Sequence, residues 1–154
     1  MLATALVALT LALPQHGVVV PGQSFAGVRL GATGPQVAAA WGRRYGVCRD
    51  CARPTWFYTY HPFQPQGAAV TFRAGAAESF YTLRAPEGWR TNRGLKVGDP
   101  ETKVTLLYGA LPRAECGTYS ALVLMQARRE TQFYVFAGKV YGFGLSSVGA
   151  PRCH

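Results

Sequence analysis

Four cysteines carry most of the chemistry that this chain of 154 residues could perform. Cys48 and Cys51 have the Cys-x-x-Cys spacing of thiol–disulfide exchange sites, which work best at the start of a helix, where the helix dipole lowers the thiol pKa. Here the pair follows a predicted helix, with residues 43–47 in between. We therefore expect a structural disulfide, and a thiol–disulfide oxidoreductase using Cys48 and Cys51 remains the enzymatic alternative.

A metal site is the second chemistry that these residue types suggest. Cys48, Cys51 and His61 are zinc-ligand types, and Cys153-His154 could complete a set of four. Only one Cys-x-x-Cys pair is present, however, and an oxidising compartment removes the thiolates that zinc needs. We expect no metal ion and no cofactor.

Hydrolytic catalysis has little support in the sequence. The chain has seven acidic residues, and two of them are explained by a predicted helix start: Asp99 as its N-cap and Glu101 as compensation of the helix dipole. No Gly-x-Ser-x-Gly nucleophile motif is present. We therefore predict no catalytic residues and a protein that is not an enzyme.

An uninterrupted apolar run at residues 2–13 precedes everything else. It is shorter than the roughly 20 residues that span a bilayer, and its length suits the apolar region of a secretory leader. The sequence predicts a secreted, extracellular protein. A chain that stays tethered to the membrane by this N-terminal segment is the alternative.

The net charge of +9 is the strongest compositional feature. Thirteen of the sixteen basic residues are Arg, alongside abundant Ala, Gly and Pro, which is the pattern that a coding bias gives. The functional alternative is attraction to an extracellular protein or to an acidic component of the cell envelope. Nucleic acid is not expected as a partner, because the basic residues are scattered rather than aligned along one element.

Two stretches of the chain are similar to each other. Residues 27–42 and 94–109 align without a gap at an offset of 67, and both predict a short helix that ends at a glycine, Gly42 or Gly109. Thr33 and Gln36 form a capping box at the first helix. At the second helix Asp99 is the expected cap, with Pro100 in the first helical position.

Predicted strands follow each helix, and the hairpins of the two halves align at an offset of 63, with Ala74-Gly75 and Ala137-Gly138 as their turns. The strands are 55–60, 68–73, 77–84, 119–126, 131–136 and 139–145. In the last strand Gly142 and Gly144 suggest packing beneath a large side chain.

The order of elements predicts an α+β fold: two tandem αβββ repeats forming one antiparallel sheet with helices on one face. Residues 1–20 are the leader or anchor with a linker, 21–84 the first repeat, 85–93 a connector and 94–154 the second repeat. The two repeats together form one globular domain. The pairing of Cys48 with Cys51 and of Cys116 with Cys153 is favoured because each bridge then stays within one repeat, while crossed pairings remain possible.

The helix-entry motif carries a resemblance to known families. It stands here as Val28-x-Leu30-Gly31-Ala32-Thr33-x-x-Gln36-Val37-x-x-x-Trp41-Gly42. It resembles the entry motif of the tandem α/β unit in the β-lactamase-inhibitory proteins and of the single unit in the SmpA/OmlA-type outer-membrane-assembly lipoproteins. The resemblance implies a fold, an exported bacterial setting, a disulfide in each repeat and a binding role. In the second copy Asp99, Pro100 and Lys103 replace the Met, Thr and Gln of the motif.

A candidate binding surface lies on the sheet face that the helices leave open. Strict alternation along the strands places Phe80, Arg84, Tyr141 and Phe143 together there, and mixed aromatic and Arg composition is typical of interfaces. Cross-strand aromatic pairs that only stabilise the sheet are the alternative. We predict a secreted, non-enzymatic binding protein that inhibits an extracellular enzyme or acts as an envelope-associated module. A purely structural secreted protein is the third possibility.

Overall fold

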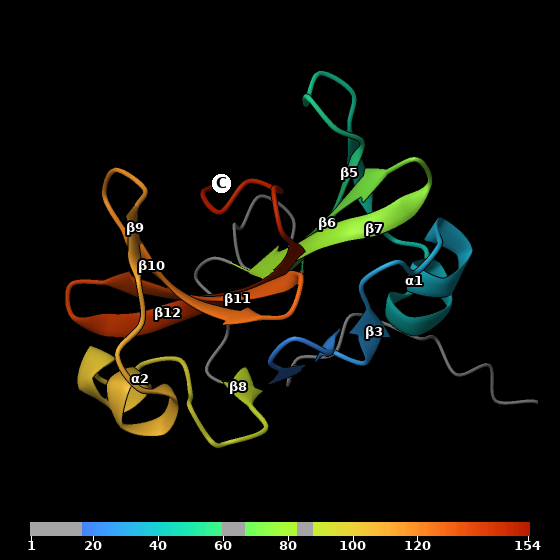
Figure 1. Ribbon diagram of the computed structural model, residues 1–154. Coiled ribbons are helices and arrows are strands. Elements are labelled where there is room, and N and C mark those ends of the chain that lie inside the picture. The colour runs from blue at the N-terminus through green and yellow to red at the C-terminus, as the bar shows by residue number, and fades with distance from the viewer. Residues whose placement is uncertain (1–16, 60–66, 83–87) are drawn as a thin grey trace, which may run out of the picture.

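The computed structural model describes residues 17–59, 67–82 and 88–154. In this part of the chain two short helices accompany twelve strands, which form two sheets (Figure 1). No helix among these residues is long and apolar enough to cross a membrane.

The larger sheet has eight antiparallel strands, four from each half of the chain. Their order is β4-β5-β6-β7-β12-β11-β10-β9. The halves meet where β7 pairs with β12, with Phe80 opposite Leu145. The strands are β4 Gly46–Cys48, β5 Thr55–Thr59, β6 Gly67–Arg73, β7 Ala76–Thr82, β9 Arg113–Glu115, β10 Ser120–Gln126, β11 Arg129–Phe136 and β12 Lys139–Ser147.

The smaller sheet has four short strands in the order β3-β2-β1-β8. Strand β1 (Val18–Val20) runs antiparallel to β2 (Ser24–Phe25) and parallel to β8 (Arg90–Thr91), and β2 also pairs with β3 (Val28–Arg29). The β1 strand therefore links the entry segments of the two halves.

The predicted fold class is wrong. The protein is predominantly β rather than α+β, because a second sheet forms and each helix has only eight residues. Each half also supplies four strands to the larger sheet, not three. The sequence reasoning treated the residues around Val19 as a linker, but the Val18–Val20 run is β-branched and Val19 is fully buried.

The first helix, α1 (Gly34–Trp41), begins as its sequence predicts. The Thr33 side chain accepts a hydrogen bond from Gln36 N–H, and Gln36 Oε1 accepts one from Thr33 N–H, so the capping box is confirmed. The helix ends at Gly42.

The second helix, α2 (Glu101–Tyr108), begins one residue later than expected. Its N-cap is Pro100, not Asp99. Asp99 Oδ2 instead accepts hydrogen bonds from Lys96 N–H at 2.7 Å and Lys103 Nζ at 2.8 Å. Desolvation raises the pKa of Asp99, but these bonds and the two lysine charges outweigh it and lower the pKa overall.

Both entry segments bond to the hairpin strand of their own half in the same way. A glycine N–H donates to a strand carbonyl, and that strand residue returns a bond to the carbonyl of the residue after the glycine. The bonds run from Gly31 to Ala77 at 2.8 Å, from Ala77 to Ala32 at 2.8 Å, from Gly98 to Val140 at 2.7 Å and from Val140 to Asp99 at 2.9 Å.

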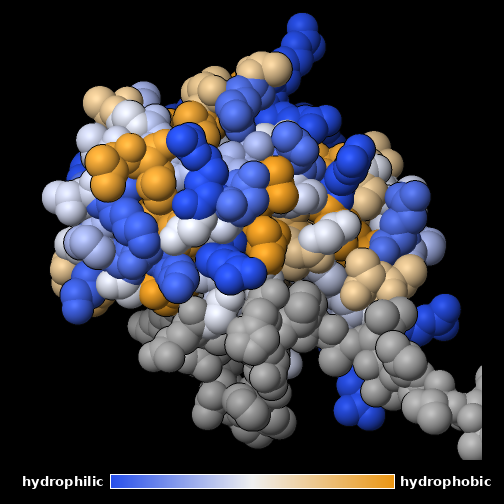
Figure 2. Space-filling view, turned by 90° about the horizontal axis from the view of Figure 1, so that it is seen from below, coloured by the Kyte–Doolittle hydropathy of each residue, from blue (hydrophilic) through white to orange (hydrophobic). Residues whose placement is uncertain are grey.

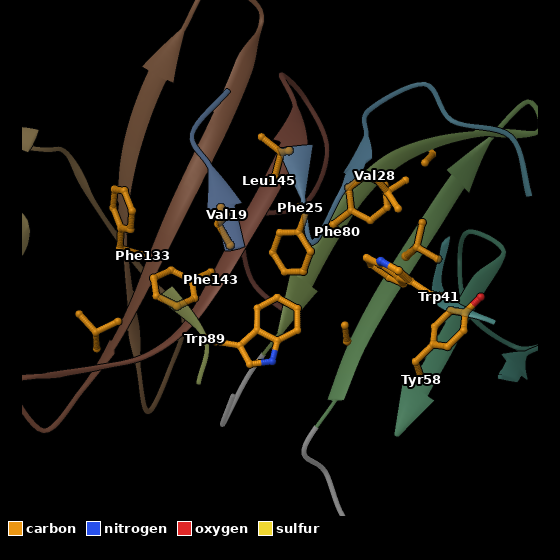
Figure 3. Close-up of a cluster of buried hydrophobic side chains, with 14 of the residues drawn as sticks. Val19, Phe25, Val28, Trp41, Tyr58, Phe80, Trp89, Phe133, Phe143 and Leu145 are labelled. Atoms are coloured by element: carbon orange, nitrogen blue, oxygen red, sulfur yellow. The ribbon is translucent and has the colours of Figure 1, made fainter. Parts of the chain in front are cut away.

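The main hydrophobic core lies between the larger sheet and a layer made of α1, the smaller sheet and α2, which cover one face of it (Figures 1 and 3). We call this the covered face and its opposite the outer face. Phe25 of the smaller sheet stacks on Phe80 of the larger one with ring centroids 5.8 Å apart, and Trp89 packs 5.2 Å from Phe25. On the surface seen from below, hydrophobic residues form separate areas among hydrophilic ones (Figure 2).

Candidate functional site

The predicted surface of Phe80, Arg84, Tyr141 and Phe143 does not form. Phe80 and Phe143 are 0% exposed and belong to the core on the covered face (Figure 3). Tyr141 is half-buried and packs on the outer face with a separate cluster. Arg84 lies outside the described residues. The structure therefore brings together only Phe80 and Phe143, and it buries both.

Two β-bulges explain the error. In each hairpin one extra residue interrupts the pairing, which reverses the alternation of side chains beyond it. Strict alternation therefore placed Tyr141 on the face of Phe143, whereas the bulge places it on the opposite face. The extra residues are Glu78, between the pairs Thr71–Ser79 and Phe72–Ala77, and Tyr141, between the pairs Tyr134–Gly142 and Val135–Val140.

Tyrosines gather on the outer face of the second half. Tyr134 is fully buried, and Tyr119 packs edge-on against it at 5.8 Å and against Tyr141 at 5.7 Å. Tyr81, from β7, also packs against this group. We call Tyr81, Tyr119, Tyr134 and Tyr141 the tyrosine cluster.

Residues 150–154 lie over the tyrosine cluster, and we call them the C-terminal strap. The His154 ring stacks on Tyr81 with centroids 3.6 Å apart and 7° between the planes. His154 N–H also donates to Tyr119 Oη at 2.7 Å. Cys153 is bridged to Cys116, so a covalent bond holds the strap at the end of β9. In Figure 1 the C-terminus lies on the side of the larger sheet away from the helices.

A buried carboxylate of the larger sheet binds the strap. Glu130 is 1% exposed and takes two bonds from Arg152: Nε to Oε2 at 2.7 Å and Nη2 to Oε1 at 2.6 Å. This bidentate geometry is the strong form of an Arg–carboxylate pair. The same bonds raise the pKa of Arg152.

The absence of a side chain at Gly144 leaves space for the side chains of Gln132 and Tyr134. A Cβ atom there would lie 2.5 Å from Gln132 Oε1 and 2.6 Å from Tyr134 Oη. The prediction that Gly144 packs beneath a large side chain is therefore confirmed.

Burial changes the pKa values of three groups on the outer face. Desolvation lowers the pKa of His154 to about 4, because its imidazole is stacked against Tyr81 although the residue as a whole is exposed. Burial raises the pKa of Tyr81 and, much more strongly, that of Tyr134. These groups offer aromatic surface and neutral hydrogen-bonding atoms, so their chemistry is that of packing rather than of proton transfer.

Both favoured disulfides are present: Cys48–Cys51 with Cα atoms 5.6 Å apart and Cys116–Cys153 with Cα atoms 5.4 Å apart. The first bridge follows edge strand β4, and Cys51 is exposed. No helix begins at either cysteine within the described residues, so a helix dipole does not assist a thiolate there.

Arginines gather around the same edge strand. Arg43 and Arg44 precede β4 and Arg49 follows it; all three are exposed, and none forms an ion pair within the described residues. We call these three residues with β4 the basic edge. Nearby Arg53 and Arg73 are different, since both bind the buried Glu78, at 2.7 and 2.5 Å.

The zinc ligand set considered from the sequence cannot be assembled from the residues that the structure describes. His61 lies outside the described residues, and Cys48 and Cys51 are bonded to each other. Within residues 17–59, 67–82 and 88–154 no three His, Cys, Asp or Glu side chains form a group that could hold a metal ion.

Sequence reasoning missed most of the outer-face residues, namely Tyr81, Tyr119, Tyr134 and His154. One signal could have found some of them. The favoured Cys116–Cys153 bridge already requires the last residues of the chain to lie beside Tyr119, three residues beyond Cys116.

No family model matches the sequence, and no curated protein matches it. Solved structures with a similar fold are bacterial. An extracellular protein containing an SCP domain from Bacillus anthracis has 12% identity and a TM-score of 0.58 over 77% of this chain and 44% of that protein. A DUF4309 family protein, YjgB from Bacillus subtilis, has 17% identity and a TM-score of 0.56 over 75% of this chain and 78% of that one.

The uncharacterised protein yfeY from Escherichia coli has 13% identity and a TM-score of 0.51 over 82% of this chain and 95% of that one. This chain thus spans less than half of the B. anthracis protein. At these identities the likeness shows the fold alone. These structures include no β-lactamase-inhibitory protein and no SmpA/OmlA-type lipoprotein, so they give the resemblance expected from the entry motif no direct support.

Proposed function

We propose that this chain is an exported, non-enzymatic binding protein whose partner carries acidic groups. Export is supported by two disulfides, which persist in oxidising compartments, and by the fold shared with proteins described as extracellular or secretory. We further propose that the chain is a tandem of one unit. The matching bonds of Gly31 and Gly98 to their hairpins support this proposal.

The basic edge is the observation that carries the binding proposal. Arg is the side chain best suited to carboxylates and phosphates, since its planar guanidinium donates two parallel hydrogen bonds. Arg43, Arg44 and Arg49 are exposed and have no acidic partner in the described residues, whereas Arg53 and Arg73 neutralise Glu78. Three unpaired guanidinium groups around one exposed strand form a site for an acidic surface of an extracellular enzyme or of an envelope component.

Binding of fluorescein-labelled poly-L-glutamate tests this proposal. The triple variant Arg43→Glu, Arg44→Glu and Arg49→Glu is compared with a matched control, Arg29→Glu, Arg90→Glu and Arg128→Glu, which changes three other exposed arginines by the same charge. We expect the basic-edge variant to bind about tenfold more weakly and the control to change affinity about threefold at most. Equal losses in the two variants, or no binding by the unaltered protein, would contradict the proposal.

The oxidoreductase alternative rests on one observation: the Cys48–Cys51 bridge has an exposed cysteine and Arg49 between its ends. Mild reduction followed by alkylation and mass spectrometry discriminates between the functions. Rapid labelling of Cys48 and Cys51 ahead of Cys116 and Cys153 would favour the oxidoreductase. A bridge that resists mild reduction would favour the binding protein, and a chain with an inert bridge that also fails to bind acidic probes would be a structural protein.

A further inference from the structure

Edge strand β4 has an open side. It pairs with β5 and with no other strand in the described part of the chain, so it ends the eight-stranded sheet. Edge strands with free backbone groups are templates for an added strand.

The backbone of Val47 points into this open side. Phe72 N–H donates to the Pro54 carbonyl between β5 and β6. Hydrogen-bonding direction alternates along a strand, so the backbone groups of Trp56 also face β6, and those of its neighbours face β4. Val47 lies opposite Trp56 and is therefore in a non-hydrogen-bonded position. Its N–H and C=O are directed away from the sheet.

The other end of the sheet does not offer the same site. Cys116 N–H donates to the Tyr119 carbonyl and Val123 N–H donates to the Pro112 carbonyl, so the backbone groups of Pro112 and Cys116 face β10. By the same alternation the Glu115 carbonyl of β9 faces away from the sheet. That carbonyl lies 3.7 Å from Cys153 Sγ of the C-terminal strap. The side chain of Arg113, in the same strand, is paired with Glu101 of α2.

The side chains around β4 specify what could be added. Val47 is 53% exposed, which is unusual for a valine at an edge that must avoid non-specific pairing. Arg43 and Arg44 lie before the strand and Arg49 lies after it, next to the exposed Asp50, so arginines flank an apolar centre at both ends and the positive charge is greater before the strand. The complementary partner is an extended peptide with a β-branched centre and acidic residues on each side.

We propose that β4 is a strand-addition site that takes up such an acidic, extended segment of a partner protein. This inference rests on the proposed function and adds the mode of recognition to it. Backbone bonds at Val47 fix the direction and register of the added strand, and the arginines select for acidic flanks.

The test uses two fluorescein-labelled probes, the peptide EEVTVEE and poly-L-glutamate, and two variants. Val47→Pro removes the outward N–H at a position where an edge strand tolerates proline. Val47→Thr is its matched control, because it keeps the N–H and the β-branched shape. We expect Val47→Pro to weaken peptide binding about tenfold and Val47→Thr about threefold at most, with poly-L-glutamate binding unchanged in both. Urea unfolding checks that both variants are folded.

The outcomes separate the two proposals. If Val47→Pro binds the peptide like the unaltered protein while the basic-edge variant loses both probes, strand addition is overturned and the charge-based function stands. If the basic-edge variant keeps both probes, the proposed function itself fails. Amide exchange gives an independent reading: peptide binding should slow exchange of Val47 N–H. Slow exchange in the free protein, together with a dimeric mass in light scattering, would show that a second copy of the chain occupies the edge and would overturn the proposal.

Discussion

The two ends of the eight-stranded sheet are made of corresponding elements, but they differ in what lies against the edge strand. Each end has a three-residue edge strand that follows a short helix, β4 after α1 and β9 after α2. The β9 end is bound by the C-terminal strap through the Cys116–Cys153 bridge. The β4 end has a local bridge, Cys48–Cys51, and Arg43, Arg44 and Arg49 form no ion pair with any described residue. The comparison shows that the C-terminal strap lies against the end of β9, whereas no described strand pairs with the open side of β4.

The buried carboxylates of the two halves show the same difference. Glu78 sits at the bulge of β7 and is held by Arg53 and Arg73 of its own half. Among the described residues Glu130 has one arginine partner, Arg152 of the strap, and Gln132 Nε2 donates a longer hydrogen bond of 3.5 Å to Glu130 Oε2. The negative charge of Glu130 is therefore neutralised by an arginine only while the strap stays in place. Glu78 would still have one arginine partner if the other were lost.

The largest expected loss of stability comes from removing the Cys116–Cys153 disulfide, and it should exceed the loss from removing Cys48–Cys51. The chain-entropy model gives about 4 kcal/mol for the Cys116–Cys153 bridge, whose cysteines are 37 residues apart, and about 2 kcal/mol for Cys48–Cys51, which are three apart. Urea unfolding of the two double-serine variants measures the free energies. If the Cys48–Cys51 variant lost as much stability as the Cys116–Cys153 variant, the prediction that the strap bridge stabilises the fold more would be wrong.

Next in size is the loss of an arginine partner. Arg152→Ala leaves the buried Glu130 without its cationic partner, and we expect a loss of about 2 kcal/mol, below the 3–5 kcal/mol of a fully buried pair because the Arg152 side chain is 44% exposed. Arg73→Ala is the matched change in the first half, and it should cost about 0.5 kcal/mol because Arg53 remains on Glu78. Equal losses would contradict the contrast between the two carboxylates.

Glycine substitutions probe the packing beneath the strap and the β4 edge, with smaller expected effects. Gly144→Ala places a methyl group against Gln132 and Tyr134, and it should destabilise the protein by about 1 kcal/mol, since both contacts are with side-chain ends that can shift slightly. Gly46→Ala, in β4, meets no atom within 4 Å and should change the unfolding free energy by less than about 0.5 kcal/mol. Thermal unfolding of both variants checks this prediction, and a larger loss at Gly46 would show that the β4 edge is more constrained than its open side implies.

The smallest effect is a pH dependence confined to the strap. His154 has a pKa of about 4 in the folded protein and about 6.5 when unfolded, so between these values the unfolded chain holds a proton that the folded chain lacks. Its contribution is therefore present above pH 6.5 and is lost as the pH falls towards 4. His154→Phe keeps a ring on Tyr81 but cannot titrate. Unfolding free energies at pH 7 and pH 4.5 should differ less in this variant, and an identical pH dependence would contradict the assigned pKa.

Local signals in the sequence were sufficient for several elements. The Thr33–Gln36 capping box, the glycine ends of both helices and the two Ala-Gly hairpins are found where the sequence predicts them. The smaller sheet was missed even though it carries the same signal. Ala26-Gly27 has positive φ angles of 46° and 82°, like Ala74-Gly75, and joins β2 to β3 as a tight turn.

What the sequence by itself determined is therefore local: where helices start and stop, and where hairpins turn. These features depend on side chains and backbone angles within a few residues. The tertiary structure alone decided which face each side chain occupies. A single bulged residue at Glu78 and at Tyr141 reverses the alternation, and no local pattern marks it, because a bulge is a property of two paired strands. The open edge at β4 was likewise decided by long-range pairing, since the number of partners of a strand depends on the order of the whole sheet.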